Sequence, residues 1–153
     1  PDPDPDPDPD PDPVVNPELL GSYNIIQTHT ICTLSFGIQA NISVTFNDTG
    51  AVFSGETLTW SNSSSGPDPS TCTLTSVTLG SMGYSDLQSQ FSLTPAPGPT
   101  SSEYIQMISN ISQSLLPNSV GGASGISSSG SFGNAEVTML VDDEGVAFSW
   151  IKQ

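Results

Sequence analysis

The chain has 153 residues and a mass of 15.9 kDa, which is the size of one domain with a single hydrophobic core. Sixteen acidic residues stand against one basic residue, Lys152, and the formal charge of −15 excludes nucleic acid and anionic membrane surfaces as partners. The longest apolar runs span a few residues, far short of the roughly 20 that a transmembrane helix needs.

The first 13 residues are a strict Pro-Asp repeat. Each proline fixes φ and biases the preceding Asp toward extended geometry, so we expect a polyproline II rod about 40 Å long. Three residues per turn send successive carboxylates to different faces, which disfavours a calcium cage. The rod is either a solvated linker or an assembly element that docks on other copies. We assign 1–16 to this segment and 17–153 to a globular domain, and the residues expected to act in assembly are Asp2, Asp4, Asp6, Asp8, Asp10, Asp12, Val14 and Val15.

An extracellular location is expected, because Ser and Thr replace charged residues across most of the chain. The chain opens within a repeat and without an initiator Met, which we interpret as removal of an export signal. Cys32 and Cys72 make an even count outside any metal-binding spacing, so we predict one disulfide. Closing that loop would stabilise the fold by roughly 4 kcal/mol. Two unpaired buried thiols are the alternative.

Four sites match the Asn-x-Ser/Thr acceptor of N-glycosylation. Asn41 and Asn47 have odd numbers in a stretch whose apolar residues are even-numbered, so both are expected on the solvent-exposed face of a strand. Asn62 lies in a Ser-rich loop, and Asn110 lies on the polar face of a predicted helix. We predict that these sites carry glycans. The alternative is coincidence in a chain rich in Ser and Thr.

The first half of the chain has the alternation typical of strands. Its even-numbered apolar residues predict a continuous pattern with one buried face. The expected strands are 23–28, 30–36, 38–46, 51–54, 56–60, 72–79 and, more weakly, 87–93. The alternating residues are Cys32, Leu34, Phe36, Ile38, Ala40, Ile42, Val44 and Phe46.

The second half predicts one helix and a terminal hairpin. Thr100 and Glu103 make a capping box and Pro117 ends the helix, which we place at 100–116. Residues 118–134 are rich in Gly and Ser and are expected to be mobile, and the hairpin strands are 135–141 and 146–151. We therefore expect a mainly β domain, a single antiparallel sandwich or barrel of about eight strands with one α-helix over an edge or open end. The apolar face of the helix is formed by Tyr104, Ile108, Ile111 and Leu115, and its polar face by Glu103, Gln106, Asn110 and Gln113.

Few residues suit catalysis. His29 is the single histidine and no Ser has a Gly-x-Ser-x-Gly context, so a Ser-His-Asp site has no support. We interpret His29 as a surface or hydrogen-bonded strand residue, and the carboxylates as turn, cap or solvated-face residues. We interpret the acidic turn 142–144 as a solvated hairpin tip, with weak calcium binding as the less favoured alternative. We expect neither enzymatic activity nor a cofactor.

Two resemblances add to these expectations. The repeat resembles the X-Pro repeats of hydroxyproline-rich extracellular glycoproteins of algae and plants, which implies hydroxylation and O-linked sugars on its prolines. The run Leu20-Gly21-Ser22-Tyr23, the Thr45-Phe46 strand before Gly50 and the helix followed by a hairpin resemble the layout of small lipocalin-like and META-type secreted β domains. The prolines concerned are Pro1, Pro3, Pro5, Pro7, Pro9, Pro11 and Pro13.

Two functions fit this sequence. The first is a structural subunit of an extracellular glycoprotein filament or surface appendage, assembled through the rod and the extended lead 14–20 docking on neighbouring copies. The second is a small secreted ligand-binding or adhesive β module on a rigid stalk. The expected partners are other copies of the chain and glycans.

Overall fold

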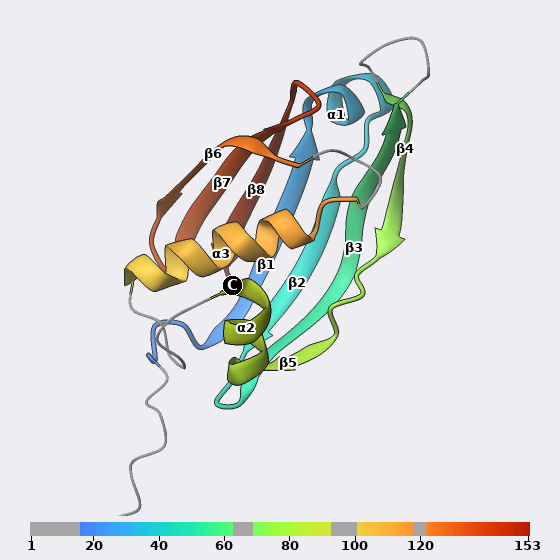
Figure 1. Ribbon diagram of the computed structural model, residues 1–153. Coiled ribbons are helices and arrows are strands. Elements are labelled where there is room, and N and C mark those ends of the chain that lie inside the picture. The colour runs from blue at the N-terminus through green and yellow to red at the C-terminus, as the bar shows by residue number, and fades with distance from the viewer. Residues whose placement is uncertain (1–15, 63–68, 93–100, 118–121) are drawn as a thin grey trace, which may run out of the picture.

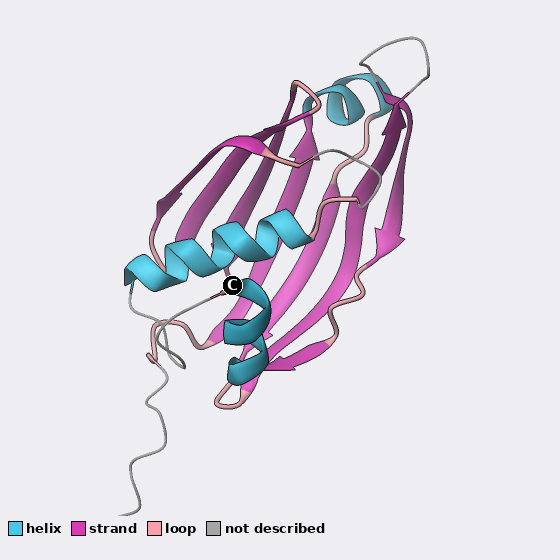
Figure 2. Cartoon of the chain, in the orientation of Figure 1, coloured by secondary structure: helices cyan, strands magenta, loops and turns pink. Residues whose placement is uncertain are grey.

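The computed structural model describes residues 16–62, 69–92, 101–117 and 122–153 (Figure 1). In these ranges the chain forms one antiparallel sheet of eight strands and three short helices (Figure 2). The mainly β, antiparallel fold is thus confirmed, with two more helices than expected. The elements are β1 Gly21–His29, α1 Thr30–Phe36, β2 Ala40–Phe46, β3 Gly50–Asn62, β4 Pro69–Ser76, β5 Ser81–Gly83, α2 Tyr84–Phe91, α3 Ser101–Ser114, β6 Ser124–Gly130, β7 Asn134–Val141 and β8 Glu144–Lys152.

The sheet is organised around β1, which pairs with β2 on one side and β8 on the other. The full order is β4-β3-β2-β1-β8-β7-β6, with β5 paired to the start of β3. The predicted terminal hairpin is confirmed as β7 and β8. Its two-residue turn places Asp142 and Asp143 at positive φ, as tight hairpins require.

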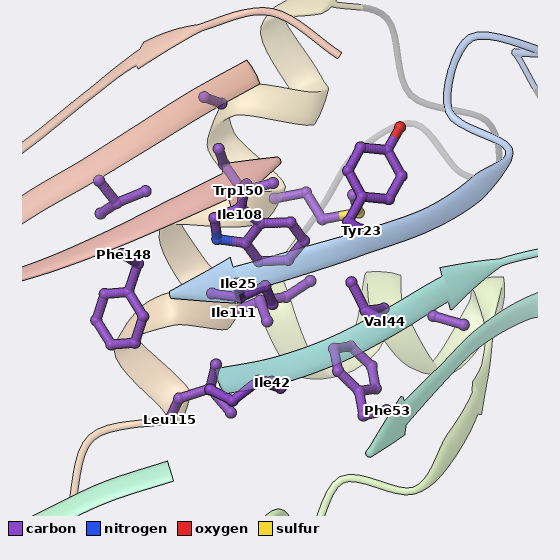
Figure 3. Packing of buried hydrophobic residues seen from close by; sticks show 14 of the residues in the cluster. Tyr23, Ile25, Ile42, Val44, Phe53, Ile108, Ile111, Leu115, Phe148 and Trp150 are labelled. Carbon is purple, nitrogen blue, oxygen red and sulfur yellow. The ribbon is translucent and has the colours of Figure 1, made fainter. Parts of the chain in front are cut away.

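The hydrophobic core lies between the sheet and α3, which crosses one face of it (Figures 1 and 3). The predicted apolar face of the helix is buried, and the ring of Tyr104 lies 6.2 Å from that of Tyr23 on β1. Trp150 of β8 packs in the same layer and donates its indole N–H to Ser112 Oγ of α3 at 3.1 Å. Apolar contact and one buried hydrogen bond therefore fix α3 on the sheet.

The segment 30–36, predicted as a strand, is the helix α1. His29 Nδ1 accepts hydrogen bonds from the amides of Ile31 and Cys32, which caps the first turn. Gly37 ends the helix in the left-handed region, at φ 67°. The alternating pattern therefore does not continue through 32–38: Cys32 is buried, whereas Leu34 is 80% exposed. Beyond α1 the alternation holds in β2, whose even-numbered residues are all buried.

Two later segments also differ from expectation. Residues 84–91 form the helix α2 where the weak strand 87–93 was predicted, because Tyr84, Leu87 and Phe91 share one buried helical face. Within the Gly/Ser-rich stretch 118–134, residues 124–130 form β6, which pairs with β7 through its backbone. Strands 51–54 and 56–60 are one continuous strand, β3.

Candidate functional site

A pocket of about 510 Å³ lies where β1 ends and α1 begins, beside the turn between β7 and β8. Thr30 Oγ1 donates to the carbonyl of Gly145 at 3.1 Å and ties α1 to that turn. Leu34 and Leu140 are 80% and 47% exposed, so two large apolar side chains border open solvent here. The lining combines Leu34, Met139, Leu140, Val146 and Ala147 with Thr28, Thr30, Thr33 and Thr138.

His29 also lines this pocket and is fully buried. Because its Nδ1 accepts two amide hydrogen bonds, the imidazole is neutral and carries its proton on Nε2. Burial lowers the pKa of His29 below its ordinary value, against opposing contributions from its hydrogen bond to the backbone and from Asp142. The strand position of His29 and its hydrogen bonding agree with the sequence interpretation, but the side chain is not at the surface.

Gln27 and Trp60 lie next to His29 in the interior. Beyond Gly55, strand β3 is no longer paired with β2 but continues to pair with β4, and among the described residues no strand pairs with its other side there. Gln27 compensates by accepting the amide N–H of Leu58 at Oε1, 2.9 Å away. The ring of Trp60 packs on that of His29 with centroids 4.5 Å apart. Side chains thus connect β1 to β3 where the backbone ladder stops.

The predicted disulfide is confirmed: Cys32 of α1 is bonded to Cys72 of β4. Cys32 is the buried residue of α1, and Cys72 is the register partner of Trp60. The disulfide therefore fastens α1 over the cluster of Gln27, His29 and Trp60 and holds one wall of the pocket.

The cap by His29 predicts a pH-dependent stability. A folded-state pKa below the unfolded one means that the unfolded chain takes up the proton first as pH falls. The contribution of His29 to the free energy of unfolding is complete at pH values above the unfolded pKa of about 6.5. It is lost as the pH falls from there through the lowered pKa of the folded state. We expect denaturant titrations to show declining stability between about pH 7.5 and 5.5, above the ordinary range of carboxylates.

The control for this expectation is His29→Asn, which keeps an oxygen able to cap the helix and removes the titrating group. The decline over this pH range should shrink in the variant. Identical pH dependence in the two proteins would show that His29 is not the responsible group.

The four glycosylation acceptors occupy different environments. Asn41 and Asn47 are exposed, on β2 and in the turn that follows it. Asn47 Oδ1 accepts from the amide and hydroxyl of Thr49, the third residue of its acceptor sequence. Asn110 is half-buried, and its Nδ2 donates to the carbonyl of Phe91 at 2.6 Å, so a glycan there would replace a contact between α3 and α2. Asn62 ends β3, and its side chain is outside the described part of the structure.

The assembly residues and the prolines of the repeat, 1–15, all lie outside the described residues. The described part of the lead, from Asn16, does not extend away from the domain as predicted. Leu19 is fully buried, and its amide donates to Asn16 O in a turn. Tyr23 donates its hydroxyl to Leu19 O, and burial raises the pKa of Tyr23 to about 12. Lys152 Nζ donates to Glu18 O at 2.8 Å, so this lead is bound to its own domain and not free to pair with a neighbour.

Comparisons with protein-family models, with curated proteins and with solved structures found no match. Among the described residues, no group of three or more His, Cys, Asp or Glu side chains could hold a metal ion. None of the helices in the described ranges is long and apolar enough to cross a membrane. What the site offers chemically is a pocket with apolar walls, threonine side chains and a buried polar cluster beneath α1.

Proposed function

We propose that the chain is a stalked extracellular module that binds an amphiphilic small molecule without negative charge in the pocket at α1. The position of that pocket carries the proposal. Residues 1–15 join the domain ahead of Gly21, at the start of β1, whereas the pocket lies at the other end of this strand, about 30 Å away at 3.3 Å per residue. A tether at one end would present the pocket at the opposite end.

The lining defines the chemistry of the ligand. Pockets of a few hundred Å³ with apolar walls and few polar groups are typical of small-molecule sites. The adjacent turn carries Asp142, Asp143 and Glu144, and the chain has a formal charge of −15 with its one basic residue, Lys152, at the far end of the sheet. An anionic ligand would be repelled, so the best occupant is neutral or cationic with an apolar part.

The extracellular location is supported by three independent features. The disulfide Cys32–Cys72 is of a kind that persists in oxidising compartments. Two acceptor asparagines, Asn41 and Asn47, are exposed. The chain is rich in Ser and Thr, and only 11% of its residues are charged.

Fluorescence titration with two dyes tests the pocket on the full chain. Neutral Nile red should bind, whereas anionic anilinonaphthalene sulfonate should not. Leu34→Asn and Leu140→Asn should each weaken Nile red binding by about tenfold, the effect of losing part of an apolar wall. Ile151→Asn is the matched control, because Ile151 is 38% exposed and does not line the pocket. Equal weakening by all three variants, or no binding of Nile red, would contradict the proposal.

A second candidate is the structural subunit of an extracellular filament, and one observation favours it. Strand β6 is the last strand of the described sheet, and its sequence SGISSSG has no charge or proline. Natural proteins usually protect such edges, so β6 could accept a strand from another copy. Sedimentation of the full chain separates the candidates: a monomer supports the stalked module, and long polymers support the filament subunit.

A further inference from the structure

Three buried side-chain groups beneath α1 lack a protein partner. Gln27 Nε2, His29 Nε2 and Trp60 Nε1 have no hydrogen-bond acceptor in the described part of the chain. The exposed fractions of the three side chains are 0%, 0% and 3%. Buried polar groups in native proteins are almost always paired, so three together require an explanation.

All three groups are hydrogen-bond donors. Gln27 Oε1 is already bonded to the amide of Leu58, which leaves only the NH₂ group of this side chain. His29 Nδ1 accepts the amides that begin α1, which places the ring proton on Nε2. The indole N–H of Trp60 can only donate. Their common requirement is therefore an acceptor.

The three donors belong to one small region of the interior. Gln27 and His29 are two residues apart on the same face of β1, and both are buried. Opposite them, Leu58 and Trp60 are two residues apart on β3. Gln27 bonds to Leu58 and His29 packs on Trp60, so the two rows face each other where no backbone ladder joins β1 to β3.

We infer that Gln27, His29 and Trp60 form an internal site that binds an uncharged, hydrogen-bond-accepting oxygen. An anion does not fit, because His29 is neutral while it caps α1 and the chain's single Lys or Arg residue lies at the opposite end of the sheet. The oxygen is either that of an ordered water or that of a carbonyl or hydroxyl group on a neutral ligand. Of the three residues, His29 is the one that also lines the outer pocket.

The two tryptophans of the chain provide a matched test. Trp60→Phe and Trp150→Phe remove the same atoms from buried rings, and the donor of Trp150 has a known partner in Ser112. If Trp60 also has an acceptor, both variants should raise the unfolding equilibrium constant by about tenfold or more in denaturant titrations. If the indole N–H of Trp60 is unpaired, Trp60→Phe should raise the unfolding equilibrium constant clearly less than Trp150→Phe does.

Nuclear magnetic resonance of the ¹⁵N-labelled full chain identifies the source of the oxygen. Two indole N–H signals are expected, and both should lie in the hydrogen-bonded range. A cross-peak between the Trp60 signal and water supports ordered water. A neutral oxygen-containing compound extracted from the native protein, and missing from Trp60→Phe, supports a ligand. A Trp60 signal in the unbonded range, together with a small cost of Trp60→Phe, would overturn the inference.

This inference and the proposed function can fail separately. Nile red binding reports on Leu34 and Leu140 at the outer pocket, whereas the tryptophan variants report on the interior. If Nile red does not bind, the internal site can still be supported by the tryptophan variants, and the reverse also holds.

Discussion

Replacing Cys32 and Cys72 together by Ala is expected to lower the free energy of unfolding by about 4 kcal/mol. The disulfide closes a loop across 40 positions, and its removal frees that loop in the unfolded chain. The folded state also loses the anchor of α1, which has seven residues, too few for a stable isolated helix. Guanidinium titrations of the full chain under oxidising conditions provide the measurement.

The double variant should also lose the pocket before it loses the sheet. Thr30, Thr33 and Leu34 of α1 line the pocket, while β7 and β8 are paired independently of the disulfide. Nile red binding should therefore disappear in conditions where circular dichroism still shows the sheet. A variant that unfolds at the wild-type denaturant concentration would refute the role given to this bond.

Gly55→Ala is expected to destabilise the fold by about 3 kcal/mol, the combined scale of left-handed strain and overpacking. Gly55 has φ 106°, and a Cβ atom there would lie 2.6 Å from the carbonyl oxygen of Asn41. This is the point at which β3 stops pairing with β2 and continues with β4. The substitution therefore acts on the backbone just before the part of β3 that carries Leu58 and Trp60.

Gly37→Ala is the control for Gly55→Ala. Gly37 also has positive φ, at 67°, but an added Cβ would meet no atom of the described residues within 4 Å. Its cost should be limited to the backbone strain, about 1–2 kcal/mol. Thermal unfolding of both variants gives the comparison, and equal costs would show that the contact with Asn41 is unimportant.

Regular alternation and helical periodicity predicted much of this fold from the sequence. In β7 the alternation of buried and exposed residues runs over more than seven residues. In α3 the helical period of apolar residues runs over more than two turns. Patterns of this length are clear in the sequence. β6 was missed because its pairing uses backbone groups, and the sequence SGISSSG has too few apolar residues to show a period. A strand that is exposed on both faces has no such signal.

The candidate site was harder to predict, because the buried positions change from odd-numbered residues in β1 to even-numbered residues in β2. The short helix α1 between them causes the shift. Continuing the even pattern through 30–36 placed His29 on the wet face. Histidine is not among the residues usually preferred at helix N-caps, so the start of α1 had no standard signature.

The remaining part of the site needs tertiary information. Gln27 is buried where β3 continues beyond its pairing with β2, and it accepts the amide N–H of Leu58. The odd period of Tyr23, Ile25 and Gln27 within β1 was a usable signal for its burial. Nothing local to Leu58 or Trp60 indicated that they would face this strand.

The most direct test of the stalked module uses the three methionines of the chain. All three are buried, but Met139 lines the pocket at α1, whereas Met82 and Met107 lie elsewhere in the core. With ¹³C-methyl methionine in the full chain, titration with Nile red should shift the methyl signal of Met139 and leave the other two in place. A shift confined to Met82 or Met107, or bound dye with no shift at Met139, would contradict binding at the end of the domain opposite the stalk.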